Sequence, residues 1–197
     1  MTNTDALQKS RRKRRRQRRV VTVLGFLVIS TGLAWFFESQ ATTTVIVARY
    51  ADRASTVGND PALSAAGERR ARELARVLGD VDVVAGVDAI FVAPTKSSIE
   101  TSVPLARLND APVHTIKDPD DVESLVLRIL DEYKGKIVLV ITEARDIQPL
   151  IAEMHGSKKL PDIEEAEYDN IYIVSIPWFG KVKTLRIRYG LAYASQA

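Results

Sequence analysis

Residues 43–52, which read TTVIVARYAD, decide the fold of this chain. Positions 45–47 are apolar and β-branched, a pattern that predicts a strand buried on both faces. The apolar run ends at Arg49 and Tyr50, and a polar loop follows them. Ligands of open α/β sheets bind beyond the carboxyl ends of the strands. A functional site is therefore expected to begin at Arg49, Tyr50 and Asp52.

Further strands and helices alternate along the rest of the chain. A helix is predicted from Ser64, as N-cap, to Gly79, with Ala71, Leu74, Ala75 and Leu78 on its apolar face. Alternation of this kind, ending in a hairpin, predicts an α/β fold: a three-layer sandwich with a mostly parallel sheet and a C-terminal hairpin. The other predicted strands are 89–92, 112–116, 137–141, 171–176 and 182–188, and the other predicted helices are 97–108 (Ile99, Val103 and Ala106 inward), one beginning at 122 (face 122, 125, 126 and 129) and 149–155.

Charge is segregated towards the N-terminus. Residues 1–19 hold nine Lys or Arg and one acid, whereas the remaining 178 residues hold 19 basic and 24 acidic residues. The body of the protein is thus acidic, which argues against a domain that coats nucleic acid. We expect no nucleic-acid partner, and the basic tail is expected to attract anionic lipid.

An uncharged apolar segment, residues 20–37, follows the basic tail. Its 18 residues reach the lower limit for a transmembrane helix, and Trp35, Phe36 and Phe37 lie at its far end, as is typical of a membrane interface. The positive-inside rule leaves the N-terminus in the cytoplasm and exports the rest, so a periplasmic or other extracytoplasmic domain is expected. The length favours an uncleaved signal anchor, although Ser39-Gln40-Ala41 would suit a cleavage site.

The predicted organisation has five parts. These are a basic cytoplasmic tail (1–19), one transmembrane helix (20–37), a linker (38–42), an α/β domain (43–190) and a C-terminal tail (191–197). The chain has no cysteine, which excludes disulfides, a thiol nucleophile and a thiolate metal site.

Residues 43–190 resemble the histidine phosphatase superfamily, whose fold is phosphoglycerate-mutase-like. Five stretches carry the resemblance, in the order of the family's motifs: VIVARYAD, LSAAGERRA, IFVAPTKSSIETSVPLA, IVLVITEARDIQPLI and EYDNIYIVSI. The resemblance implies two histidines at the phosphorus atom, two arginines that hold the phosphoryl oxygens, and a further acidic or histidine residue that protonates the leaving group. Imidazole suits nucleophilic attack near neutral pH, and guanidinium binds phosphate bidentately.

The matching positions depart from that pattern. Arg49 keeps the first arginine, whereas Tyr50 stands at the nucleophilic histidine and Glu143 at the second histidine. Ser97 falls at the second arginine, with Lys96 beside it. His114 and His155 are the chain's two histidines, and we expect both to be structural or exposed.

The substituted residues are poorly suited to phosphoryl transfer. A phenol with an ordinary pKa of about 10 is mostly protonated at neutral pH, and a carboxylate at position 143 would repel a phosphoryl dianion. Glu143 is expected to form an ion pair with Arg49 or Arg145 that fills the site. A retained anion pocket, with Arg49, Lys96 and Arg145 as its candidates, is the alternative. A metal bridging Asp52 and Glu143 is not expected, and no cofactor is expected.

The predicted function is that of a pseudoenzyme: a membrane-anchored, exported domain that binds or scaffolds an unknown protein or small anionic ligand. One alternative is an active phosphatase or phosphomutase with a rearranged site. Another is a structural membrane element whose basic tail acts at the inner leaflet. The acidic segment 162–169 is expected to be a solvated loop, with a cation or a basic partner as the other possibility.

Overall fold

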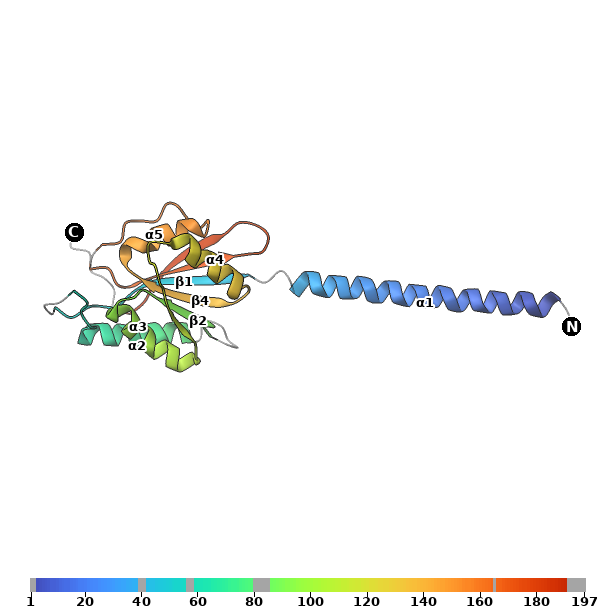
Figure 1. Ribbon diagram of the computed structural model, residues 1–197, viewed down its shortest axis with the longest axis horizontal. Helices are drawn as coiled ribbons and strands as arrows, with labels where there is room; N and C mark the ends of the chain where they lie inside the picture. The colour runs from blue at the N-terminus through green and yellow to red at the C-terminus, as the bar shows by residue number, and fades with distance from the viewer. Residues whose placement is uncertain (1–2, 39–41, 56–58, 80–85, 165, 191–197) are drawn as a thin grey trace. The chain divides into compact units, whose positions relative to one another are not determined.

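The computed structural model describes residues 3–38, 42–55, 59–79, 86–164 and 166–190. It divides into two units, residues 1–40 and 41–197 (Figure 1). The elements in chain order are α1 (Asn3–Glu38), β1 (Thr43–Arg49), α2 (Ala65–Gly79), β2 (Ala89–Val92), α3 (Lys96–Asn109), β3 (Val113–Thr115), α4 (Val122–Glu132), β4 (Ile137–Thr142), α5 (Ala144–Glu153), β5 (Asn170–Ile176) and β6 (Lys183–Arg188).

The second unit is a mixed sheet with helices on both sides. Its six strands lie in the order β3-β2-β4-β1-β5-β6. The pairs β3–β2, β2–β4 and β4–β1 are parallel, while β5 is antiparallel to both β1 and β6. Helices α2 and α3 cover one face, and α4 and α5 cover the other (Figure 1). The predicted α/β sandwich, mostly parallel sheet and closing hairpin are all present.

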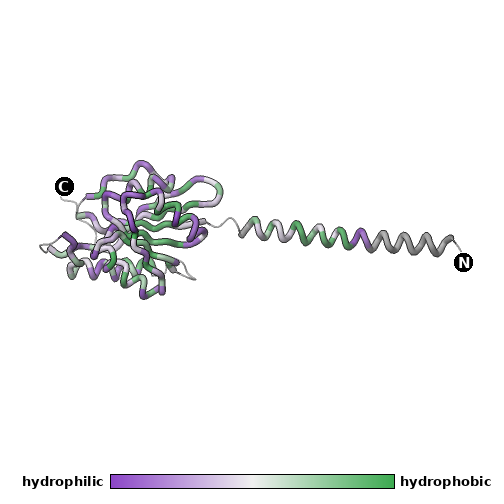
Figure 2. Tube along the Cα trace, viewed as in Figure 1, coloured by the Kyte–Doolittle hydropathy of each residue, from purple (hydrophilic) through white to green (hydrophobic). Residues whose placement is uncertain are grey.

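Strand β1 lies inside the sheet and is buried on both faces, as its sequence predicts. Residues 45–48 have no exposed surface. Val45 and Val47 pack in the cluster beneath α4 and α5, whereas Ile46 and Ala48 pack in the cluster beneath α2. Figure 2 shows the hydrophobic strands gathered at the centre of this unit.

Helix α2 also follows its predicted pattern. Ala71, Leu74, Ala75 and Leu78 are buried, and the Ser64 hydroxyl accepts a hydrogen bond from the Gly67 amide at 3.0 Å. The side chains expected to face inward from α4 pack in the opposite cluster.

Helix α3 differs from the prediction on its buried face. Ile99 is 43% exposed, and the buried residues are instead Ser97, Ser98, Thr101, Ser102 and Leu105. Their hydroxyl groups are satisfied locally: Thr101 donates to the Ser97 carbonyl at 2.6 Å, and Ser102 donates to the Ile99 carbonyl at 2.7 Å. Because helical turns offer these acceptors, a face of small hydroxyl residues is buried without loss of hydrogen bonds.

Helix α5 begins five residues earlier than the predicted 149–155. It starts at Ala144, directly after β4, and Pro149 lies inside it. Burial of Ile147, Leu150 and Ile151 outweighs the hydrogen bond that the proline removes.

The first unit is a single helix, α1. Within it, residues 17–36 have a mean hydropathy of 1.8 and are long and apolar enough to cross a membrane. The predicted basic tail and apolar segment thus belong to one helix, whereas Ser39-Gln40-Ala41 lies outside the described residues.

The close approach of α2 to the loop after β1 yields a stability prediction. A Cβ added at Gly67 would overlap the backbone carbonyl of Asp52. Although alanine is the better helix former by about 1 kcal/mol, Gly67→Ala is expected to lower the free energy of unfolding by about 1–3 kcal/mol. Urea unfolding of the full chain in detergent measures this loss. Ala66→Ser, at the exposed neighbouring position, should stay within about 0.5 kcal/mol of wild type, and a stabilising Gly67→Ala would contradict the packing described here.

Candidate functional site: the contacts of Arg53

The ends of β1 and β4 bring Tyr50 and Glu143 to one edge of the sheet. Arg49 is in register with Thr142, and the Tyr50 amide donates to the Thr142 carbonyl at 3.3 Å. Tyr50 and Glu143 therefore follow neighbouring parallel strands, in agreement with the positions that the family resemblance assigns to them.

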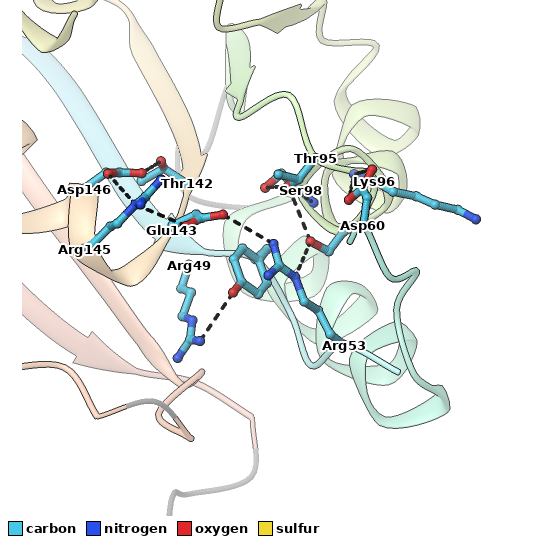
Figure 3. Close-up of polar contacts among 12 residues, drawn as sticks. Arg49, Arg53, Asp60, Thr95, Lys96, Ser98, Thr142, Glu143, Arg145 and Asp146 are labelled. Carbon is cyan, nitrogen blue, oxygen red and sulfur yellow. Dashed lines mark hydrogen bonds and ion pairs between the residues drawn. The ribbon is translucent and has the colours of Figure 1, made fainter. Parts of the chain in front are cut away.

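Arg53 connects these residues. Its guanidinium carbon lies 3.7 Å from the centre of the Tyr50 ring, a cation–π contact. Its Nε donates to the Ser97 hydroxyl at 2.9 Å, and its terminal nitrogen lies 3.6 Å from the Glu143 carboxylate. Figure 3 shows Arg53 extended between Glu143 and the start of α3. One arginine side chain thus contacts Tyr50, Ser97 and Glu143 together.

Tyr50 is enclosed by arginines. Its side chain is 5% exposed. One Arg49 nitrogen lies 3.5 Å from the phenol oxygen, and the Arg49 guanidinium carbon lies 5.2 Å from the ring centre. The phenol oxygen therefore faces Arg49, and the ring is covered by Arg53.

Arg49 points away from Glu143 and holds the segment before β5. It is buried, and it donates to the backbone carbonyls of Glu164 and Glu167, both at 3.3 Å. Its guanidinium carbon lies 4.1 Å from the centre of the Tyr168 ring. Burial raises the pKa of Tyr168 despite the opposing charge of Arg49, so this phenol stays neutral.

The expected ion pair of Glu143 is therefore partly corrected. Glu143 pairs with Arg145 at 3.3 Å, as one predicted alternative states, but its second partner is Arg53 rather than Arg49. The reason is geometric: Arg49 ends a buried strand, and its side chain lies beside carbonyl groups that need a donor.

The acidic segment 162–169 is not simply a solvated loop. Glu167 and Asp169 are buried, and Arg188 of β6 binds both, at 2.8 and 3.2 Å. Arg49 binds the backbone of the same segment. Two arginines distant in sequence therefore neutralise and fix part of this acidic run.

The start of α3 also has protein-supplied partners. Thr95 is the N-cap, and the Asp60 carboxylate accepts from the Lys96 amide at 2.9 and 3.1 Å. The Lys96 side chain points away from Arg53 and lies 4.0 Å from Glu100 (Figure 3). A carboxylate thus already occupies the positive end of this helix.

Arg145, the third candidate for anion binding, lies on the surface. Its side chain is 74% exposed and contacts Glu143 and Asp146, at 3.3 and 3.5 Å. Burial raises the pKa of Asp146, against the lowering effect of a hydrogen bond from Thr142. Arg49, Lys96 and Arg145 therefore point in different directions and do not converge on one anion site.

The remaining candidates lie apart from this cluster. Asp52 pairs with Arg70 at 2.7 Å. Within the described residues, no group of three or more His, Asp or Glu side chains is arranged to hold a metal. His114 lies on the edge strand β3, 2.8 Å from the Tyr133 hydroxyl, and His155 is exposed after α5.

Chemically, the cluster is a closed set of ion pairs and cation–π contacts. Its guanidinium groups are engaged by a carboxylate, a hydroxyl, carbonyls and aromatic rings. The roles of Arg53 and Tyr168 were not predicted from the sequence: Arg53 lies just beyond the stretch VIVARYAD, and Tyr168, although inside EYDNIYIVSI, matches no functional position of the family. The one available signal for Arg53 was its place in the polar loop just beyond the β1 strand end.

Known structures share this fold. The chain is similar to the protein histidine phosphatase SixA in complex with tungstate, at 18% identity and a TM-score of 0.60, covering 74% of this chain and 96% of that one. It is also similar to mycobacterial glucosyl-3-phosphoglycerate phosphatase (14% identity, TM-score 0.57, covering 77% and 100%). A third is phosphoserine phosphatase from Entamoeba histolytica with 3-phosphoglyceric acid (13% identity, TM-score 0.52, covering 76% and 98%).

The domain therefore has the histidine phosphatase fold, which confirms the resemblance inferred from the five motifs. No protein-family model matches the sequence, and no curated protein matches it.

The contacts of Arg53 predict that this side chain stabilises the domain. Arg53→Ala removes the stack on Tyr50 and the bond to Ser97, and is expected to cost about 1–3 kcal/mol. Arg145→Ala removes only an exposed ion pair and should cost less than about 1 kcal/mol. Urea unfolding of both variants gives the comparison. Equal costs would mean that Arg53 is no more than a surface residue.

The contacts of Arg49 predict a local effect on the acidic segment. Arg49→Met keeps much of the apolar stem but leaves the carbonyls of Glu164 and Glu167 without this donor, so we expect a loss of about 2–4 kcal/mol. Hydrogen exchange of the amides in residues 162–169 should accelerate. Lys117→Met, at an exposed position, is the control, and unchanged exchange in Arg49→Met would show that Arg49 does not hold this segment.

Proposed function

We propose that this protein is a membrane-anchored, exported domain of histidine phosphatase fold that has lost phosphatase activity and acts as a binding or scaffolding module. The observation that carries the proposal is the position of Arg53, which contacts Tyr50, Ser97 and Glu143 together. These are the positions where the family places a histidine, an arginine and a histidine.

Loss of catalysis is supported by the chemistry of the replacements. Phosphoryl transfer depends on positive groups that stabilise the charge of the transferring phosphate. Here the guanidinium of Arg49 serves backbone carbonyls and that of Arg53 serves Glu143 and Ser97. A phosphate would have to displace these partners, and Glu143 would repel it.

Anchoring and export are supported by α1. The segment 17–36 is apolar enough to span a bilayer, and the residues before it are strongly basic. Basic residues are retained on the cytoplasmic side, so the domain that follows would lie outside the cytoplasm. Without a catalytic site, such a domain would act through its surface, on a protein or an anionic ligand.

Hydrolysis of p-nitrophenyl phosphate by the full chain in detergent tests the loss of activity. The expected rate equals that of buffer, while an active histidine phosphatase assayed in parallel turns over. Intact mass after incubation with the substrate should show no phosphorylated protein, because Tyr50 stands where the family places its nucleophilic histidine and a phenol is mostly protonated at neutral pH.

Turnover above the buffer rate would favour the alternative, an enzyme with a rearranged site, provided that Tyr50→Phe or Arg49→Met abolishes it. Arg107→Ala, an exposed change on α3, is the matched control. Activity that survives all three changes would identify a contaminating phosphatase instead.

A further inference from the structure

We propose that the turn between β5 and β6 contacts the lipid interface on the side of the membrane where the chain emerges. The contact uses Trp178 and Phe179 together with nearby lysines, and it would give the domain a second attachment besides α1. This inference rests on the membrane anchoring proposed above, and it adds a lipid-binding surface to the domain.

The turn presents two exposed aromatic side chains. Trp178 is 53% exposed and Phe179 is 85% exposed. Among the described residues of the second unit, the other Phe and Tyr side chains are buried or half-buried. Aromatic residues exposed at the tip of a hairpin cost hydration free energy in water, whereas the membrane interface is where Trp is enriched.

The strand register places this turn at the end of the sheet where the chain enters the domain. Thr43, the first residue of β1, pairs with Ile176, the last residue of β5. The turn that follows Ile176 therefore lies beside the start of β1, at the opposite end of the strand from Arg49 (Figure 1).

The connection to α1 is short. Helix α1 ends at Glu38 and β1 begins at Thr43. Five residue steps span at most about 18 Å when fully extended. If the apolar part of α1 crosses a bilayer, this end of the domain stays within that reach of α1's end, and the tether keeps the turn at high effective concentration near the lipid.

Lysines gather at the same end. Of the eight lysines after residue 42, six lie in segments at this end of the sheet and are exposed: Lys134, Lys136, Lys158, Lys159, Lys181 and Lys183.

Contacts around the turn bring four of these lysines together. The Ser157 amide donates to the Thr184 hydroxyl at 2.9 Å, which joins the segment carrying Lys158 and Lys159 to β6. Two acidic residues are also relevant to the charge of this region. Asp88 pairs with Lys136 at 3.1 Å, and Glu153 is the last residue of α5. We define the hairpin-tip patch as the two aromatic residues, the two lysines of the turn and the start of β6, and the two lysines of the segment joined to β6: Trp178, Phe179, Lys181, Lys183, Lys158 and Lys159.

This combination favours a bilayer over a protein partner. Aromatic rings insert at the level of the headgroups, and lysines bind anionic phosphates without demanding a fixed geometry. A basic residue near an anionic surface shifts the equilibrium by about fivefold. The occupant we infer is therefore anionic phospholipid of the same membrane that α1 crosses.

The two tryptophans of the chain, Trp35 and Trp178, provide separate reporters. The full chain is reconstituted in phosphatidylcholine vesicles containing phosphatidylglycerol, with brominated lipid as the quencher. Trp35→Phe leaves Trp178 as the reporter of the turn, and Trp178→Phe leaves Trp35 as the reporter of α1. We expect Trp178 emission to shift to the blue and to be quenched by brominated lipid.

The two reporters distinguish the two proposals. Quenching of Trp35 without quenching of Trp178 would overturn the inference about the turn and leave the anchor intact. Absence of quenching for both would overturn the anchor, and the inference with it. A Trp178 shift that grows with the protein-to-lipid ratio and is not quenched by lipid would identify a second copy as the occupant, and would also overturn the inference.

Charge reversal tests the role of the lysines. In the Trp35→Phe background, Lys181→Glu with Lys183→Glu should lower the ratio of docked to undocked domain by at least tenfold on phosphatidylglycerol vesicles. Lys96→Glu with Lys117→Glu makes the same change in net charge away from the turn and should have little effect. Equal loss in both double variants would overturn a specific role for the hairpin-tip patch.

The aromatic contribution is tested separately. Phe179→Ser, which removes no charge, should weaken quenching of Trp178 on vesicles of phosphatidylcholine alone as well.

Discussion

The pairing of β1 with β4 on one side and β5 on the other is the constraint on which the rest of the structure depends. The parallel pairing with β4 places the end of β1 beside the end of β4, so that Tyr50 and Glu143 follow neighbouring strands. The antiparallel pairing with β5 places the start of β1 beside the end of β5. Residues 45–48, which make this pairing, have no exposed surface, and a strand buried on both faces tolerates no slip in register. Both ends of the domain are therefore fixed by one apolar strand.

At the carboxyl end of β1, the protein supplies its own partners for the positive charges that a phosphate would otherwise meet. Arg53 is held by a carboxylate, a hydroxyl and an aromatic ring, and Arg49 by two carbonyls and a second ring. Buried guanidinium groups require such partners, because an unpaired buried charge is costly. The same contacts that stabilise the domain thus compete with any phosphate. We regard this competition as the physical basis of the proposed loss of activity.

At the amino end of β1 the chemistry is the reverse. This end presents exposed aromatic rings and lysines rather than buried ion pairs. Among the described lysines at this end, Lys136 forms an ion pair, with Asp88. The arginine cluster and the exposed turn therefore lie at opposite ends of β1.

The sequence by itself determined the strand at residues 43–49, the apolar face of α2, the hairpin and the histidine phosphatase fold, because these depend on local periodicity and on motifs in order. Through the family resemblance it also assigned Tyr50, Ser97 and Glu143 to one site. Only the tertiary structure decided which arginine joins them. Arg53 lies in a loop without a motif, and its partners come from α3 and the end of β4. The start of α5, the hydroxyl face of α3 and the burial of Glu167 and Asp169 were likewise settled by long-range contacts. Sequence patterns record burial along one element, whereas side-chain partners depend on which elements the sheet brings together.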